Sequence, residues 1–353
     1  MTETGQKQEK HIAVIDFRGV QPLTPERSRF TIAGPVGVEL VAQVDGPVPA
    51  ASADPLSPDG TCVCREPLLV RPAGAGAIAA LTLAALGAQV RLLAALADDA
   101  FRAIVTDWLQ ARGIELIPFG EIAGTPALLT VRGSEGERLS IACAGRLQCV
   151  TAATLQDALP PAEGTLLLAG FALLRALGPD EAAKVLRHAR DARVRTALLL
   201  TALPGERLTM EDVVPLLPHA QVVVCTPDAL RRVTKRPEAD TGARALLDAG
   251  APAVALLRDR HGSSVYRPSP LGMQRTEAPF HLEVEPDPSA PGLVAAGPAY
   301  AAAFLWALAH NDNDYRAAAF ANDIAARAGA SRQGVLALWS SMEEAPLAHV
   351  YAS

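Results

Sequence analysis

Residues 292–308 have the composition of an anion-binding turn that leads into a helix. Gly292, Ala295, Ala296 and Gly297 are small, and an alanine-rich apolar run that predicts a helix follows them. The first N–H groups of a helix have no partner within it, and the helix dipole favours negative charge at that end. We therefore predict a phosphate cradle, although small residues also precede helices that merely lie close to a sheet. The residues of this cradle are Ala295, Ala296, Gly297 and Pro298.

Few other side chains are spaced for catalysis or metal binding. Cys62 and Cys64 are separated by one residue, but no second Cys or His pair has the spacing of a metal site. No Ser/His/Asp or Cys/His combination supports nucleophilic catalysis. We therefore expect no metal site built from cysteine and histidine.

The elements that must position the turn alternate between helix and strand patterns. Residues 73–87 have helical apolar spacing, residues 90–96 form a strand pattern, and a second helix pattern ends at Gly113. Such alternation predicts an α/β fold in which helices cover both faces of a mostly parallel sheet. Further strand or helix patterns lie at 165–170, 180–192, 196–201, 221–225, 241–249, 253–257 and 263–266.

Composition places the chain among globular proteins. Of its 353 residues, 50% are hydrophobic and 20% are charged, which suffices for one large core. The net charge of −6 without a long basic run argues against a nucleic-acid surface. Five scattered cysteines suit reduced thiols, the N-terminus lacks a signal-peptide pattern, and the longest apolar run is too short for a membrane span. We expect a cytoplasmic protein with no membrane partner.

From residue 30 to 345 the order of these patterns resembles the ribokinase/PfkB family of sugar and nucleoside kinases. The family's Gly-Ala-Gly-Asp anion hole corresponds to residues 295–298, and its catalytic Asp corresponds to Pro298. The signature Gly-Gly-x-x-x-Asn corresponds to 73–78, and the pair Asp98-Asp99 is retained. The resemblance implies a three-layer ribokinase-like sandwich with a small β-sheet lid from about 44–70 and 116–145, including a strand at 62–70 and a hairpin at 125–141.

The resemblance also implies domain limits and an assembly. Residues 1–29 would form a partly disordered N-terminal extension, 30–345 the ribokinase-like domain, and 346–353 a C-terminal tail. Lids of this kind leave exposed strand edges, which need covering. We therefore expect a homodimer formed through the lids.

The sugar-binding positions implied by the resemblance are altered. Glu39 stands at the position of the sugar-binding Asp, although a solvated Glu at a strand end explains it equally well. Ile78 replaces the sugar-binding Asn, and a hydroxyl buried against it would lose a partner at a cost of about 1–3 kcal/mol. A usual sugar is therefore predicted to bind poorly. The implied substrate-binding residues are Glu39, Gly74, Ile78 and Asp99.

The positions for the family's ATP and Mg²⁺ are altered as well. Thr226 and Ala229 replace the Asn and Glu that help to organise Mg²⁺, while Asp228 is either a substitute or a helix N-cap. Asp259 replaces the first Gly of the nucleotide turn and would repel phosphate. We expect weak ATP binding. The implied cofactor-binding residues are Thr226, Asp228, Asp259, Gly262 and Asn322.

Three functions are compatible with this sequence. The first is a pseudokinase that acts as a regulator, scaffold or sensor by binding a small sugar or nucleoside or a protein partner. The second is an active, divergent kinase in which Asp287 serves as the base, although Pro286 and Pro288 stiffen that loop. The third is another reaction in the same cleft.

Overall fold

The computed structural model describes residues 28–339, except 45–47, 49–63, 65, 135, 202–207, 259–260 and 281–285. The predictions for most of the N-terminal extension, for the C-terminal tail, for Asp259 and for the loop at 45–63 lie outside the described residues. Among the residues that it does describe, no helix is long and apolar enough to cross a membrane.

A nine-stranded sheet forms the centre of the molecule, in the order β15-β14-β13-β12-β11-β10-β1-β4-β5. All neighbours from β13 to β5 pair in parallel, and β14 and β15 add an antiparallel edge. The predicted α/β class is thereby confirmed. The strands are β1 (Arg29–Ala33), β4 (Gln89–Ala94), β5 (Glu115–Pro118), β10 (Thr165–Ala169), β11 (Arg195–Leu200), β12 (Val222–Cys225), β13 (Val254–Leu257), β14 (Ser263–Ser269) and β15 (Gly272–Ala278).

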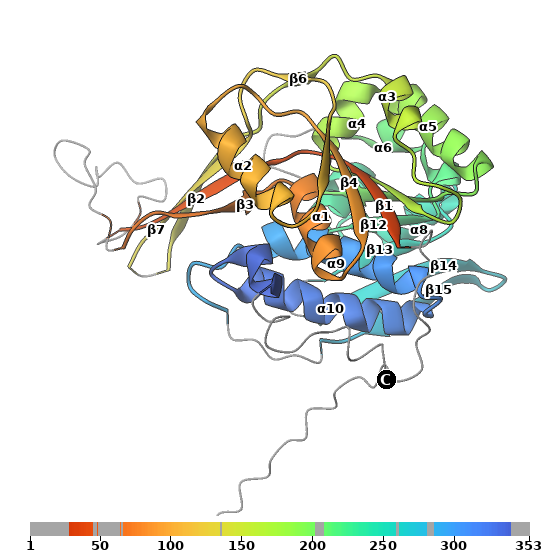
Figure 1. The fold of residues 1–353 in the computed structure, drawn as a ribbon. Helices are drawn as coiled ribbons and strands as arrows, with labels where there is room; N and C mark the ends of the chain where they lie inside the picture. The colour runs from red at the N-terminus through yellow and green to blue at the C-terminus, as the bar shows by residue number, and fades with distance from the viewer. Residues whose placement is uncertain are drawn as a thin grey trace, which may run out of the picture.

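Helices cover both faces of this sheet (Figure 1). Successive side chains of a strand point to opposite faces, so Leu167 packs in one core and Leu166 and Leu168 in the other. The first core contains α1 (Ala75–Ala85), α2 (Ala100–Gln110), α9 (Leu293–Ala309) and α10 (Asp314–Ala330). The second contains α3 (Ala152–Asp157), α4 (Phe171–Leu177), α5 (Pro179–Asp191), α6 (Met210–Val213), α7 (Pro227–Thr234) and α8 (Ala239–Asp248).

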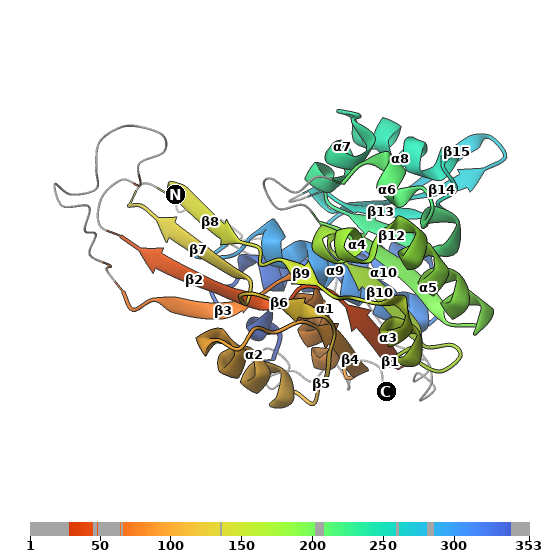
Figure 2. The same ribbon diagram turned by 90° about the horizontal axis from the view of Figure 1, so that it is seen from above.

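A second sheet of four strands projects from one end of the molecule and forms the lid (Figure 2). Its order is β3-β2-β7-β8, and β7 and β8 are the predicted hairpin. A separate two-stranded sheet pairs β6 (Glu121–Ile122) with β9 (Leu147–Gln148). The lid strands are β2 (Gly37–Gln43), β3 (Leu69–Ala73), β7 (Ala127–Arg132) and β8 (Arg138–Cys143).

The structure differs from the predicted segments around the lid. Residues 31–41, which the family resemblance assigns to an opening strand, belong to two strands, because the chain leaves the main sheet at Gly34 and Pro35 and enters the lid as β2. Gly34 is required there, since an added Cβ would lie 2.8 Å from the carbonyl oxygen of Ala169. The lid strand expected at 62–70 overlaps β3 only at its end, since β3 begins at Leu69 and extends to Ala73, and residues 116–118 lie in β5 of the main sheet.

Candidate ligand-binding site

A cavity of about 210 Å³ lies between the lid and the carboxyl ends of the main-sheet strands. Open α/β sheets bind ligands at that edge. Four residues predicted from the sequence line this cavity, namely Gly74, Thr226, Asp228 and Pro298. The structure thus brings together the turns before α1, α7 and α9. The other lining residues are Pro35, Gly37, Val38, Ala73, Ala75, Pro126, Ala127, Leu128, Ala142, Cys143, Ala144, Gly170, Ala172, Thr201 and Val294.

Helix α9 begins earlier than the sequence suggested. Gly292 is its N-cap, with φ of 61°, so Pro298 lies inside the helix rather than in its first turn. The N–H groups of Ala295 and Ala296 donate to the carbonyl oxygen of Gly292 at 3.2 and 3.0 Å. Two donors of the predicted cradle are therefore already used within the protein.

Of the remaining two cradle residues, Gly297 allows close packing and Pro298 lacks an N–H donor. An added Cβ on Gly297 would lie 3.1 Å from Cγ2 of Thr226, which shows that α9 approaches the start of α7 closely. Pro298 has no N–H and cannot donate the helical hydrogen bond to the carbonyl of Val294. This part of the cavity is consequently poor in hydrogen-bond donors.

The start of α1 is held by the turn before the lid. Gly74 has φ of 90°, and an added Cβ would lie 2.5 Å from the carbonyl oxygen of Pro35. That same oxygen accepts from the N–H groups of Gly76 and Ala77 at 3.0 and 3.3 Å. Ile78 is buried in the first core and is not among the lining residues. Two of the first donors of α1 thus also have a partner within the chain.

The start of α7 supplies polar groups to the cavity. Thr226 is the N-cap, and its hydroxyl accepts from the N–H of Ala229 at 3.4 Å. The interpretation of Asp228 as the N-cap is therefore wrong: Asp228 lies in the first turn and forms an ion pair with Arg231. Its side chain is 64% exposed, and it is the only carboxylate among the described lining residues.

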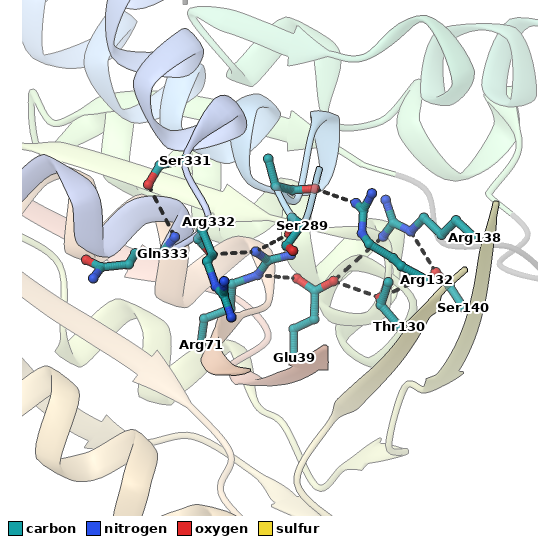
Figure 3. A network of polar contacts seen from close by, with 11 residues as sticks. Glu39, Arg71, Thr130, Arg132, Arg138, Ser140, Ser289, Ser331, Arg332 and Gln333 are labelled. Carbon is teal, nitrogen blue, oxygen red and sulfur yellow. Dashed lines mark hydrogen bonds and ion pairs between the residues drawn. The ribbon is translucent and has the colours of Figure 1, made fainter. Parts of the chain in front are cut away.

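Glu39 does not line the cavity, because its carboxylate is held in a buried polar network on the inner face of the lid (Figure 3). It accepts from Nε of Arg71 and from the hydroxyl of Thr130, both at 2.8 Å, and Nη2 of Arg138 lies 3.7 Å away. The side chains of Glu39 and Arg71 are each 1% exposed. We call Glu39, Arg71, Thr130, Arg132, Arg138 and Ser140 the lid network.

The lid network also binds the lid to the body of the molecule (Figure 3). Nη1 of Arg71 donates to the carbonyl oxygens of Ser289 and Arg332 at 2.8 and 2.7 Å, and Nη2 of Arg132 donates to that of Ala290 at 2.7 Å. Ser289 and Ala290 precede α9, and Arg332 follows α10. Lid strands and these turns are therefore fixed relative to one another.

Asp99 has a similar holding role rather than a place at the cavity. It is the N-cap of α2, where it accepts from the N–H groups of Phe101 and Arg102, and it accepts from the N–H and hydroxyl of Thr125 at 2.7 and 2.9 Å. Burial acts to raise the pKa of Asp99, but the hydrogen bonds from Thr125, Arg102 and Phe101 together hold this pKa below its usual value. The carboxylate thus binds Thr125, which lies just before β7, to the start of α2.

Asp287 is also away from the cavity lining. Its Oδ1 accepts from the N–H of Ser289 at 2.6 Å, and its own N–H donates to the carbonyl oxygen of Ala330 at 2.9 Å. Both contacts hold it in the turn that precedes α9. The structure therefore places the suggested substitute base in a structural role.

Two residues predicted on the nucleotide side meet at the end of β15. Gly262 has φ of 80°, and an added Cβ would lie 2.2 Å from the carbonyl oxygen of Ala278. Nδ2 of the buried Asn322 donates to that same oxygen at 2.8 Å and to the carbonyl of Pro279 at 3.2 Å. Neither residue lines the cavity. Both hold the β15 end in place.

Sequence analysis missed two polar residues of the cavity, Thr201 and Cys143. Thr201 follows β11, and because Leu200 is in register with Cys225, it lies beside Thr226 at the same sheet edge. The signal that could have found it is its position directly after a predicted strand. Cys143 is an exposed thiol at the end of β8.

The described lining of this cavity has few charged groups that could hold phosphate or Mg²⁺. It contains no Lys or Arg to neutralise phosphate and a single carboxylate, and the described residues include no group of three His, Cys, Asp or Glu side chains that could hold a metal ion. Phosphoryl transfer depends on such positioned charges. The cavity is suited instead to binding a small molecule through contact with apolar groups and a few hydrogen bonds.

Comparison with known proteins agrees with this fold. A family model described as pfkB family carbohydrate kinase matches residues 67–337. The adenosine kinase from Sinorhizobium meliloti is 16% identical with a TM-score of 0.66, over 90% of this chain and 99% of its own. The ribokinase from Thermotoga maritima is 16% identical with a TM-score of 0.66, over 89% of this chain and 98% of its own. The Arabidopsis thaliana ribokinase complexed with ribose and ATP is 16% identical with a TM-score of 0.62, over 88% of this chain and 98% of its own. The comparison with curated proteins gave no match.

Proposed function

The chain belongs to the pfkB family of carbohydrate kinases, and we propose that it has kept the fold as a small-molecule-binding protein that does not transfer phosphoryl groups. The observation that carries this proposal is Pro298, which lines the cavity at the position that the family resemblance gives to the catalytic base. Proline can neither accept a proton nor donate a backbone N–H. A role as a regulator, scaffold or sensor follows from binding without turnover.

Other features of the cavity support the same proposal. General-base catalysis typically contributes about 10² to 10⁴ in rate, and a lost oxyanion donor typically costs a further ~10² to 10³. The alternative base, Asp287, is engaged with Ser289 and Ala330 instead of lining the cavity. Among the described lining residues only Asp228 carries a carboxylate, and it is paired with Arg231, so the divergent-kinase hypothesis would require Asp287 to leave these contacts.

A turnover assay with Mg²⁺-ATP and a panel of sugars and nucleosides tests the proposal. We expect no phosphorylated product and, by calorimetry, millimolar affinity for Mg²⁺-ATP or none. Pro298→Asp alone should not restore turnover, because Ile78 and Ala229 remain at the other altered positions. Turnover above about 0.1 s⁻¹, within two decades of the typical enzyme, would overturn the proposal.

We also propose that the protein is a homodimer through its lids. A row of apolar side chains, Val70, Leu40, Leu129 and Ile141, crosses the outer face of the lid in register. The first three are half-buried, and Ile141 is 55% exposed. Ile141→Lys should give a monomer by light scattering at micromolar concentration, whereas Leu271→Lys, at a fully exposed turn, should leave the assembly unchanged. A monomeric parent protein would remove this proposal.

A further inference from the structure

The polar side chains of the cavity are confined to one wall. Thr201, Thr226 and Asp228 lie at the carboxyl ends of β11 and β12. Among the described residues, the lid wall is lined by Gly37, Val38, Ala73, Ala127, Leu128 and Ala142, which have no polar side chain, and by Cys143, whose side chain shares the outer face with Ile141. A ligand in this cavity therefore meets hydrogen-bonding side chains of the body at one end only.

An anionic ligand finds little to bind at that end. The described lining has no cationic side chain, and its one charged group is the carboxylate of Asp228. Four backbone donors near the cavity are already used, because the N–H groups of Gly76 and Ala77 donate to Pro35 and those of Ala295 and Ala296 donate to Gly292. Like charges repel, so the carboxylate of Asp228 acts against an anionic group. Phosphate and carboxylate groups are therefore disfavoured.

A polyhydroxylated ligand is disfavoured for a different reason. Each hydroxyl buried without a partner costs about 1–3 kcal/mol, and a sugar carries several. Against the lid wall such hydroxyls would face alanine, valine and leucine side chains. Glu39, the group that could have bound them, is engaged by Arg71 and Thr130.

We propose that the cavity binds a compact apolar molecule with a single hydrogen-bond-donating head group, an alcohol or a primary amine. The apolar body contacts the lid wall, and the head donates to Thr201, Thr226 or Asp228. This inference rests on the proposed function, because it specifies the ligand of a site that binds without phosphoryl transfer. It differs from the ligands that the family resemblance implies.

Isothermal titration calorimetry of the full-length protein provides a direct test. The probes are cyclohexanol, cyclohexylamine, cyclohexanecarboxylate and ribose, each titrated under the same conditions. We expect the alcohol and the amine to bind at one site, and ribose to bind at least about tenfold more weakly than cyclohexanol, because each hydroxyl buried without a partner costs about 1–3 kcal/mol.

Two pairs of variants locate the ligand. Ala142→Phe fills the cavity and should abolish binding, whereas Ile141→Phe, on the opposite face of the same strand, should retain it. Asp228→Asn should weaken binding of the amine more than binding of the alcohol. Asp180→Asn, in the first turn of α5, should change neither.

The outcomes separate this inference from the proposed function. Binding of ribose or cyclohexanecarboxylate as tight as that of cyclohexanol would overturn the ligand class while leaving a binding function in place. Absence of binding by every probe would overturn it as well. The turnover assay with Mg²⁺-ATP decides the proposed function by itself, whatever the calorimetry shows.

Discussion

The lid network and the cavity lie at the same boundary between lid and body, but they use polar residues in opposite ways. The network places buried charged groups, Glu39 and Arg71, in contact with each other and with backbone carbonyls of two distant turns. The cavity lining has one carboxylate, Asp228, which is largely exposed. This difference suggests that charge in this protein serves to hold the lid rather than to bind a ligand.

The comparison has a physical basis. A buried ion pair is strongly destabilising to break, since the remaining charge has no partner, whereas an exposed pair contributes little. Substitutions in the network should therefore affect stability, and substitutions at the cavity should affect ligand binding.

The largest effect is expected from Arg71→Leu. This change leaves the carboxylate of Glu39 buried with only Thr130 and, 3.7 Å away, Arg138 as partners, and breaking a buried pair typically costs about 3–5 kcal/mol in the free energy of unfolding. Urea denaturation measures that loss. Arg91→Leu breaks the exposed pair with Glu115, whose side chains are 47% and 59% exposed, and should cost under about 1 kcal/mol. Equal losses in the free energy of unfolding for Arg71→Leu and Arg91→Leu would contradict the expected difference between a buried and an exposed ion pair.

A double variant sharpens this result. Replacing both partners, as Glu39→Met with Arg71→Met, removes the two charges together, and apolar replacement of a buried pair is often nearly neutral. We expect the double variant to be more stable than Arg71→Leu, because it also removes the buried carboxylate of Glu39. Both variants lack the hydrogen bonds to Ser289 and Arg332, so a double variant no more stable than the single one would show that the loss of these bonds, and not the uncompensated charge, causes the destabilisation.

A smaller loss is expected from Asp99→Ala, which removes the N-cap of α2 and the two bonds from Thr125. Loss of an N-cap typically costs about 1 kcal/mol. The lowered pKa of Asp99 means that its carboxylate stabilises the folded state above the usual value of 3.8, and that this contribution is lost as the pH falls through the lowered pKa.

Urea denaturation at neutral and acidic pH checks this prediction. The loss in Asp99→Ala should be largest at neutral pH and should shrink in acid, where the parent protein loses the same contribution. Asp99→Asn keeps a capping oxygen and should retain part of the stability. A difference between parent and Asp99→Ala that does not change with pH would show that the charge of Asp99 is unimportant.

The smallest effect on stability is expected from Asp228→Asn. Its ion pair with Arg231 is exposed, and its interaction with the α7 dipole is worth about 0.3–1 kcal/mol. We expect a loss within that range by urea denaturation, together with the changed preference for an amine over an alcohol. A loss as large as that of Arg71→Leu would place Asp228 in the supporting structure instead of the site.

Much of this architecture followed from local sequence patterns. Alternating strand and helix segments predicted the parallel sheet covered on both faces, because side-chain periodicity depends on neighbours in the chain. The hairpin of β7 and β8 was predicted for the same reason. Gly74, Thr226, Asp228 and Pro298 were identified through the family resemblance, and all four line the cavity at the carboxyl ends of the strands, where open α/β sheets bind ligands.

Tertiary structure alone decided what Glu39, Asp99 and Asp287 do. The partners of Glu39 are 32 and 91 positions away, and Arg71 reaches a carbonyl 261 positions along the chain. No local pattern records such contacts, because they exist only once the lid, the turn before α9 and the end of α10 meet. The sequence determined where carboxylates occur, and only folding determined that Glu39, Asp99 and Asp287 would bind the protein itself.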